Sequence, residues 1–111
     1  MGSYRIERDE RACRIFIEGG FTATLTPDLQ SSLKQQVEQP TAEFVFDLAQ
    51  TDMVDSSGIG LLIALGNTLV RTHSTMKVIN VSPEILHLFR SMRLLSRLNV
   101  STDAPPEASL A

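Results

Sequence analysis

The sequence predicts a single α/β domain with a mixed central sheet of about four to five strands and three or more packed helices. First, 111 residues of which 42% are hydrophobic suit one domain with a sizeable core. Second, strand and helix patterns alternate along the chain, and two strand–helix–strand units imply parallel strand pairs. Third, two short strands at the start predict an antiparallel hairpin. The pattern leaves open whether the helices cover one face of the sheet or both.

The hairpin is predicted from a strand over residues 4–7, a polar turn over 9–11 and a second strand that Gly19-Gly20 ends. The apolar face of the second strand is formed by Cys13, Ile15 and Ile17. Alternate apolar residues are typical of a half-buried strand, so Cys13 is expected in the core. Phe16 falls on the opposite face, where it is either covered or exposed.

A first helix is predicted over residues 27–38. Thr26 is a suitable N-cap, Pro27 suits the first helical position, and Pro40 follows the end of the helix. The apolar stripe that would face the core consists of Leu29, Leu33 and Val37.

The apolar run 44–46 predicts a buried central strand, after which the chain reaches a turn at Asp55. The helix that follows has the widest apolar face and is expected to lie against the sheet. A strand over 76–81 and a third helix beginning after Ser82-Pro83 complete the pattern. Residues 94–98 either continue that helix or form a last turn before a short strand near Val100. The predicted domain therefore spans residues 1–101, with a flexible tail over 102–111.

Charge and composition exclude several classes of protein. A net charge of −3, no Trp and one Tyr argue against nucleic-acid binding. A single cysteine rules out an internal disulfide and suits a reducing compartment. The first residues lack the apolar segment of a signal peptide, and the apolar run 59–70 is too short to cross a bilayer. We therefore expect a cytoplasmic protein that does not insert into a membrane.

The stretch Asp55-Ser56-Ser57-Gly58-Ile59-Gly60 stands where a predicted strand meets a predicted helix. The N–H groups at a helix start lack partners within the helix and attract anions. Ser56 is expected to be the N-cap of a helix that begins near Ser57. On one reading the serines only cap the helix and the glycines only permit close packing, and local chemistry alone favours it. On the other, a doubled serine behind a carboxylate marks a phosphorylation site.

No other group of residues predicts a catalytic, metal or cofactor site. His73 and His87 are far apart in sequence and have no third ligand at a metal-binding spacing. Gly58 and Gly60 are not followed by the Lys-Ser/Thr pair of a phosphate-binding loop. We therefore expect a protein that is not an enzyme and carries no cofactor.

The motif Val54-Asp55-Ser56-Ser57-Gly58-Ile59-Gly60-Leu61-Leu62 resembles the signature of the STAS domain, and more narrowly that of bacterial anti-sigma factor antagonists. The resemblance extends from Tyr4 to about Val100 and includes the element order and the pair Leu88-Phe89. It implies a STAS-like fold and a partner-switching function. The unphosphorylated antagonist would bind an anti-sigma factor, usually a serine kinase of the histidine-kinase-like ATPase fold, and so free the sigma factor.

In such a pathway the kinase phosphorylates the serine after the motif aspartate, which is Ser56 here, and a metal-dependent serine phosphatase removes the phosphate. The helix start would tolerate the anion, so the phosphate should act mainly on the partner interface. The resemblance implies partner contacts at Asp55, Ser57, Gly58, Thr22 and Thr24. Asp55 either positions the Ser56 hydroxyl or contacts the kinase, or it only forms the turn.

Two positions depart from the family pattern. Thr22 stands where such antagonists usually carry an acidic residue, although Thr22 and Thr24 could hydrogen-bond near Ser56. Arg93 stands where a glycine is usual. Arg90, Arg93 and Arg97 form either a solvated helix face, which is the simpler explanation, or a partner surface unlike the usual one. The first departure keeps open an alternative, in which the chain is a constitutive STAS subunit that docks on an ABC-type lipid-transport ATPase complex.

Overall fold

The structure, a computed structural model, describes residues 2–102 as one α/β domain. The described elements are β1 (Ser3–Arg8), β2 (Ala12–Phe21), α1 (Thr26–Val37), β3 (Glu43–Asp47), β4 (Thr51–Val54), α2 (Ser56–Thr72), β5 (Thr75–Ile79) and α3 (Pro83–Ser91). The predicted α/β class, the initial hairpin and the order of helices are confirmed. The predicted tail lies outside the described residues except for its first residue, Thr102.

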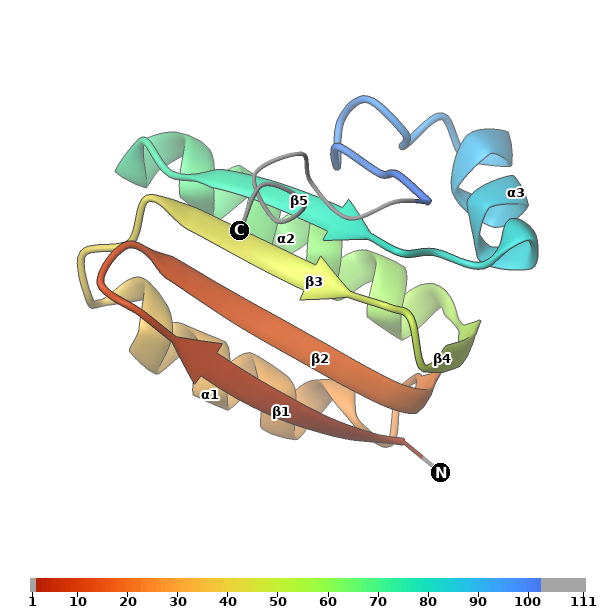
Figure 1. The fold of residues 1–111 in the computed structure, drawn as a ribbon, viewed down its shortest axis with the longest axis horizontal. Helices are drawn as coiled ribbons and strands as arrows, with labels where there is room; N and C mark the ends of the chain where they lie inside the picture. The colour runs from red at the N-terminus through yellow and green to blue at the C-terminus, as the bar shows by residue number, and fades with distance from the viewer. Residues whose placement is uncertain (1, 103–111) are drawn as a thin grey trace.

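The sheet is mixed, as predicted. Its strands run in the order β1-β2-β3-β5, and β4 pairs with the carboxyl end of β2. β1 and β2 are antiparallel, whereas the pairs β2–β3, β2–β4 and β3–β5 are parallel. Figure 1 shows α1 and α2 together behind the sheet, with α3 beside the carboxyl end of β5. The two longer helices therefore cover the same face of the sheet.

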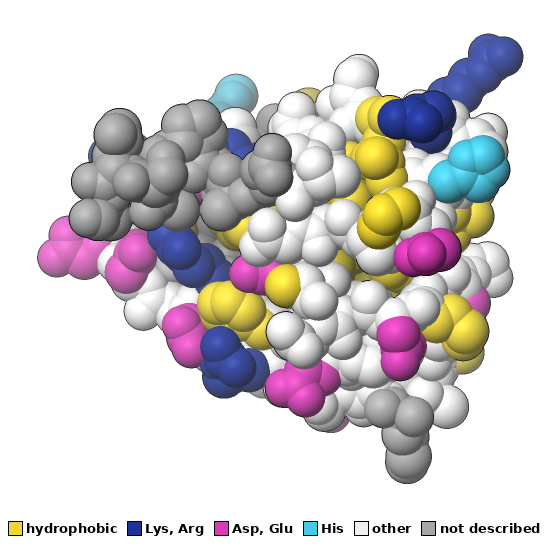
Figure 2. All heavy atoms as spheres, turned by 45° about the vertical axis from the view of Figure 1, so that its right-hand side comes forward, with side chains coloured by type: hydrophobic (Ala, Val, Ile, Leu, Met, Phe, Trp, Pro, Cys, Tyr) yellow, Lys and Arg dark blue, Asp and Glu magenta, His cyan; other side chains and the backbone are white. Residues whose placement is uncertain are grey.

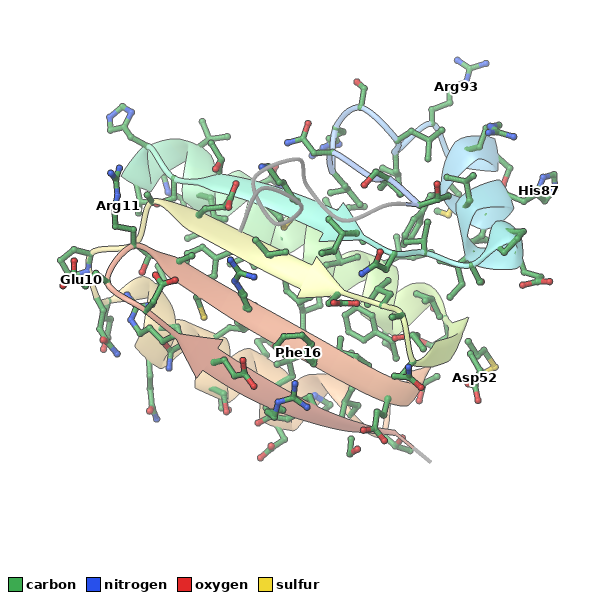
Figure 3. The ribbon with its side chains drawn as sticks, in the orientation of Figure 1. Glu10, Arg11, Phe16, Asp52, His87 and Arg93 are labelled. Atoms are coloured by element: carbon green, nitrogen blue, oxygen red, sulfur yellow. The ribbon has the colours of Figure 1, made fainter. Side chains whose placement is uncertain are left out.

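The core lies between that face and the helices. Its largest fully buried side chains are Phe21, Phe44, Phe46, Phe89, Ile15, Ile17, Leu29, Leu48, Leu62, Leu69, Leu98 and Val78. Cys13 is buried as predicted, and its burial raises the pKa of the thiol. Phe16 lies on the opposite face, where it is partly exposed and the Arg5 guanidinium stands 4.2 Å from the ring centroid (Figure 3).

The end of β2 corrects a prediction, because Gly19-Gly20 does not end the strand. β2 continues to Phe21 by changing its neighbour from β3 to β4, with an irregularity between the two glycines. At the change of partner, the Thr51 hydroxyl donates a hydrogen bond of 2.7 Å to the Ile17 carbonyl. β4 itself escaped prediction because it has four residues and lacks an alternating burial pattern.

The start of α1 is a second correction, because Thr26 is the first helical residue and not the N-cap. Leu25 occupies the N-cap position in a helical conformation, and no side chain caps this end. The preceding turn already supplies hydrogen bonds, with the N–H groups of Leu25 and Thr26 both donating to the Thr22 carbonyl. A helical turn that leads into the helix leaves no extended position for a threonine cap.

Residues 94–98 do not continue α3, and the short strand predicted near Val100 is a single bridge to Val78. α3 ends in a Schellman motif: the Leu94 N–H donates to the Phe89 carbonyl and the Arg93 N–H to the Arg90 carbonyl. Arg93 occupies the left-handed position of this motif, at φ 60°. Glycine is favoured there because it has no Cβ to clash. The arginine therefore stands at a strained backbone position.

Replacing Arg93 with glycine should raise the free energy of unfolding by about 1 kcal/mol, because it relieves this left-handed conformation. Arg90→Gly is the matched control. Because Arg90 lies within α3, this substitution should lower the free energy of unfolding by about 1 kcal/mol. Urea denaturation followed by circular dichroism measures both changes. An Arg93→Gly protein as unstable as Arg90→Gly would contradict this account of the helix end.

Candidate functional site

The motif residues lie at the carboxyl end of the parallel strands, where β4 leads into α2 (Figure 1). The Asp55 N–H donates to the Phe21 carbonyl at 3.3 Å, which joins the end of β2 to the start of the helix. Ligands and partners of α/β sheets commonly bind at this edge. The site is therefore built where two strand ends, one loop and one helix start meet.

Asp55, and not Ser56, is the N-cap of α2. Its backbone is extended, and its Oδ1 accepts hydrogen bonds from the N–H groups of Ser57 at 2.9 Å and Gly58 at 3.1 Å. The expectation that Ser56 caps the helix is thus wrong by one residue. A carboxylate satisfies two helix-start donors and also complements the positive end of the helix dipole. Asp55 therefore has a structural role as the cap of α2.

Asp55 also holds the loop that follows β2. Its other oxygen, Oδ2, accepts a hydrogen bond of 3.2 Å from the Ala23 N–H. This places Thr22 and Thr24 on either side of the contact, and their hydroxyls lie 3.2 Å from each other. Neither hydroxyl bonds to Ser56 in the described part of the chain. The Ala23 donor is a backbone group, so no sequence pattern could have identified it.

Ser56 is the first residue of α2, and its side chain is exposed. No hydrogen bond joins its hydroxyl to any of the described residues. Ser57 is half-buried, and its N–H is bound by the cap. Ser56 therefore carries the more accessible hydroxyl of the pair.

The two glycines of the motif have different roles. A Cβ on Gly58 would lie 2.5 Å from the Phe21 carbonyl oxygen and 3.1 Å from the Val54 side chain. Gly58 thus lets α2 start directly against the end of β2. A Cβ on Gly60 would meet nothing within 4 Å. Close packing explains Gly58 but not Gly60, which leaves a bare patch of helix surface one turn after Ser56.

The surroundings of Ser56 are mixed in character. Met53, on the strand that leads into the motif, is 54% exposed, and Asp52 beside it points outward (Figure 3). Figure 2 shows exposed hydrophobic side chains among acidic and basic ones on this side of the molecule. Met53 was not among the candidate residues, because a lone methionine in an unpredicted strand gives no sequence signal.

Within residues 2–102, no group of three or more His, Cys, Asp and Glu side chains is placed to hold a metal ion. A groove of about 290 Å³ does lie between α1 and α2, lined by apolar residues that include Leu33, Val37 and Leu61. None of the motif residues from Asp55 to Gly60 lines it. No described helix is long and apolar enough to span a bilayer.

The glycine pair allows a matched test of the site geometry. Gly58→Ala should lower the free energy of unfolding by about 1–3 kcal/mol, because the new methyl group meets the Phe21 backbone. Gly60→Ala should raise it by about 0.5–1 kcal/mol, because alanine is the better helix former and the space is open. Equal effects of the two substitutions in chemical denaturation would show that the helix start is packed differently.

Comparison with known proteins places this geometry in a family. The family model of the STAS domain matches residues 3–104. A search of the curated proteins gives no significant match. Several solved structures share the fold at low sequence identity.

The anti-sigma factor antagonist SpoIIAA in its unphosphorylated form matches with a TM-score of 0.84 at 16% identity, over 97% of this chain and 93% of that one. An anti-sigma factor antagonist from Mycobacterium paratuberculosis matches with a TM-score of 0.81 at 15% identity, over 99% and 92%. A sulfate transporter family protein from Wolinella succinogenes matches with a TM-score of 0.74 at 15% identity, over 87% and 81%. Because the family model matches residues 3–104 of the 111, the chain belongs to the STAS domain family.

Proposed function

We propose that this STAS domain is an anti-sigma factor antagonist whose binding to an anti-sigma factor is controlled by phosphorylation of Ser56. The observation that carries the proposal is the Ser56 hydroxyl, which is exposed and bonds to no described residue. Asp55 performs the capping that would otherwise explain a serine at this place. The motif thus has a hydroxyl that the described fold does not use.

The position of Asp55 determines where a phosphate on Ser56 would act. Phosphorylation adds about −1.5 to −2 charges at neutral pH. The Asp55 carboxylate already accepts from the N–H groups of Ser57 and Gly58, so the phosphate has to remain on the solvent side of the helix start. There it stands on the surface that carries Met53 and Gly60. A partner covering this surface would have to desolvate the phosphate, which is unfavourable.

The same geometry indicates that phosphorylation leaves the domain folded. Ser56 is exposed, so added bulk displaces no core side chain. Repulsion between the phosphate and the Asp55 carboxylate is reduced because the exposed Ser56 side chain lies in water, where the dielectric constant is high. The switch therefore acts on affinity for a partner and not on the stability of the fold.

The proposal implies three partners and a place of action. They are an anti-sigma factor that is also a serine kinase of the histidine-kinase-like ATPase fold, a metal-dependent serine phosphatase and, indirectly, a sigma factor. The domain would act in the cytoplasm on transcription, and by binding rather than catalysis. Besides Ser56, the contact surface would include Asp55, Ser57, Gly58 and the loop residues Thr22 and Thr24.

A second candidate function is a STAS subunit that docks constitutively on an ABC-type lipid-transport ATPase complex. The observation that favours it is the loop after β2, where Thr22 and Thr24 interact with each other and residues 22–25 include no carboxylate. Such a subunit needs no modification. It would co-purify with the ATPase and carry no phosphoserine under any growth condition.

Ser56→Asp should abolish binding to the cognate kinase-type anti-sigma factor, because it places a permanent negative charge on the docking surface. Ser56→Ala should bind but accept no phosphate. Isothermal titration measures the affinity, and intact mass after incubation with the kinase and ATP counts the phosphates. In thermal denaturation, both variants should have melting temperatures close to that of the wild type.

Ser57→Ala is the matched control, since it changes the neighbouring hydroxyl and should still gain one phosphate. Kinase binding by Ser56→Asp that equals the wild type would refute the switch at this residue. Loss of phosphorylation in Ser57→Ala but not in Ser56→Ala would move the site to Ser57.

A further inference from the structure

Strand β1 forms an open edge of the sheet. It pairs with β2 on one side, and no described strand lies on its other side (Figure 1). An edge strand presents unpaired backbone groups that another chain can pair with. Its side chains therefore decide whether a partner strand is accepted and in which register.

The hairpin register fixes which backbone groups point outward. The Asp9 N–H donates to the opposite Ala12 carbonyl, which marks this position as a hydrogen-bonded one of the ladder, although the Ala12 N–H donates to the Asp9 side chain. Because such pairs alternate along an antiparallel ladder, Arg5 and Glu7 bond to β2. The N–H and C=O groups of Tyr4, Ile6 and Arg8 then face the open edge. An added strand must pair through these three residues.

The charges on β1 select one self-pairing register. Arg5 and Glu7 lie on the same face, are exposed, and form an ion pair of 2.8 Å within the strand. If a second copy pairs antiparallel with Ile6 opposite Ile6, each Arg5 stands opposite the other copy's Glu7. A shift of the two-fold axis to Arg5 or to Glu7 sets like charges opposite each other. Opposite charges across strands stabilise a pair and like charges destabilise it.

The same register suits the other face of the strand. Ile6 is partly buried and packs against the core, so pairing at Ile6 would cover its remaining surface. Tyr4 is fixed to α1 by hydrogen bonds to Asp28 at 2.6 Å and Ser32 at 2.7 Å. Arg8 is fixed by a bond of 3.0 Å to the Pro40 carbonyl. Both ends of the strand are thus held in place before any partner arrives, which reduces the entropy lost on pairing.

We propose that β1 is a homodimer interface, at which two copies of this chain pair antiparallel about Ile6 and join their sheets into one. The partner is a second copy because the charge sequence of the edge complements itself only in this register. A single strand pair buries less than the ~1,200 Å² of a standard interface. We therefore expect a weak and reversible dimer, with a dissociation constant in the micromolar range or above. The proposal does not depend on the phosphorylation of Ser56.

Charge reversal tests the interface. Glu7→Arg and Arg5→Glu each set like charges opposite each other twice, so each should weaken self-association about tenfold or more. The double variant Arg5→Glu/Glu7→Arg restores both opposite-charge pairs and should dimerise like the wild type. An equimolar mixture of the two single variants should form a heterodimer. Sedimentation equilibrium at several concentrations measures self-association of the two single variants, the double variant and the mixture.

Glu38→Arg is the matched control for Glu7→Arg, since it makes the same charge change at the exposed end of α1 and should leave the dimer intact. Circular dichroism melts check that every variant is folded. A wild-type protein that stays monomeric at its highest soluble concentration would overturn the proposal. Single variants that dimerise like the wild type would also overturn it. A double variant that remains a monomer would do so as well, because the two-fold axis would then not lie at Ile6.

Discussion

The hydrogen bonds of the Asp55 carboxylate are the interactions on which the candidate site of this domain depends. Its two oxygens accept three backbone N–H groups, from Ser57, Gly58 and Ala23. One side chain therefore both starts α2 and holds the loop after β2 against it. Gly58 completes the arrangement by letting the helix start within contact distance of the Phe21 carbonyl. The exposed position of Ser56 follows from these contacts, because the neighbouring residues are the ones bound inward.

Sequence patterns predicted the α/β class, the hairpin, the three helices and the STAS resemblance, because these depend on periodicity and on a motif of six contiguous residues. They missed β4, whose four residues include exposed Asp52 and Met53. They also placed the N-caps at Thr26 and Ser56, although the first helix has no side-chain cap and the second is capped by Asp55. A cap is chosen by backbone conformation and by contacts from distant segments. Residue preference alone could not distinguish Asp55 from Ser56, since both are good N-cap residues.

The candidate site is a surface and not a pocket. Its motif residues surround a helix start, whereas the groove between α1 and α2 is lined by other residues. Gly60 adds no side chain to this surface, so a partner's backbone can approach the helix closely there. Arg93 likewise lowers stability while adding a charged group to the surface. Its guanidinium stands on a left-handed residue, a backbone conformation that glycine would adopt without strain. These features suit the protein contact that we propose for this surface.

The central position of β2 in the sheet determines how its backbone hydrogen bonds can open. It is paired with β1 on one side, and with β3 and then β4 on the other, so its hydrogen bonds break only when the sheet separates. The segment after α3 is held to β5 by hydrogen bonds between Val78 and both Asn99 and Ser101, and its Leu94 and Leu98 side chains are buried in the core. Amide hydrogen exchange should therefore show β2 opening only on global unfolding, with the segment after α3 protected by the core side chains that it buries. The Asp55 contacts attach the start of α2 to the end of β2, so the Ser56 surface keeps its shape for as long as the sheet is intact.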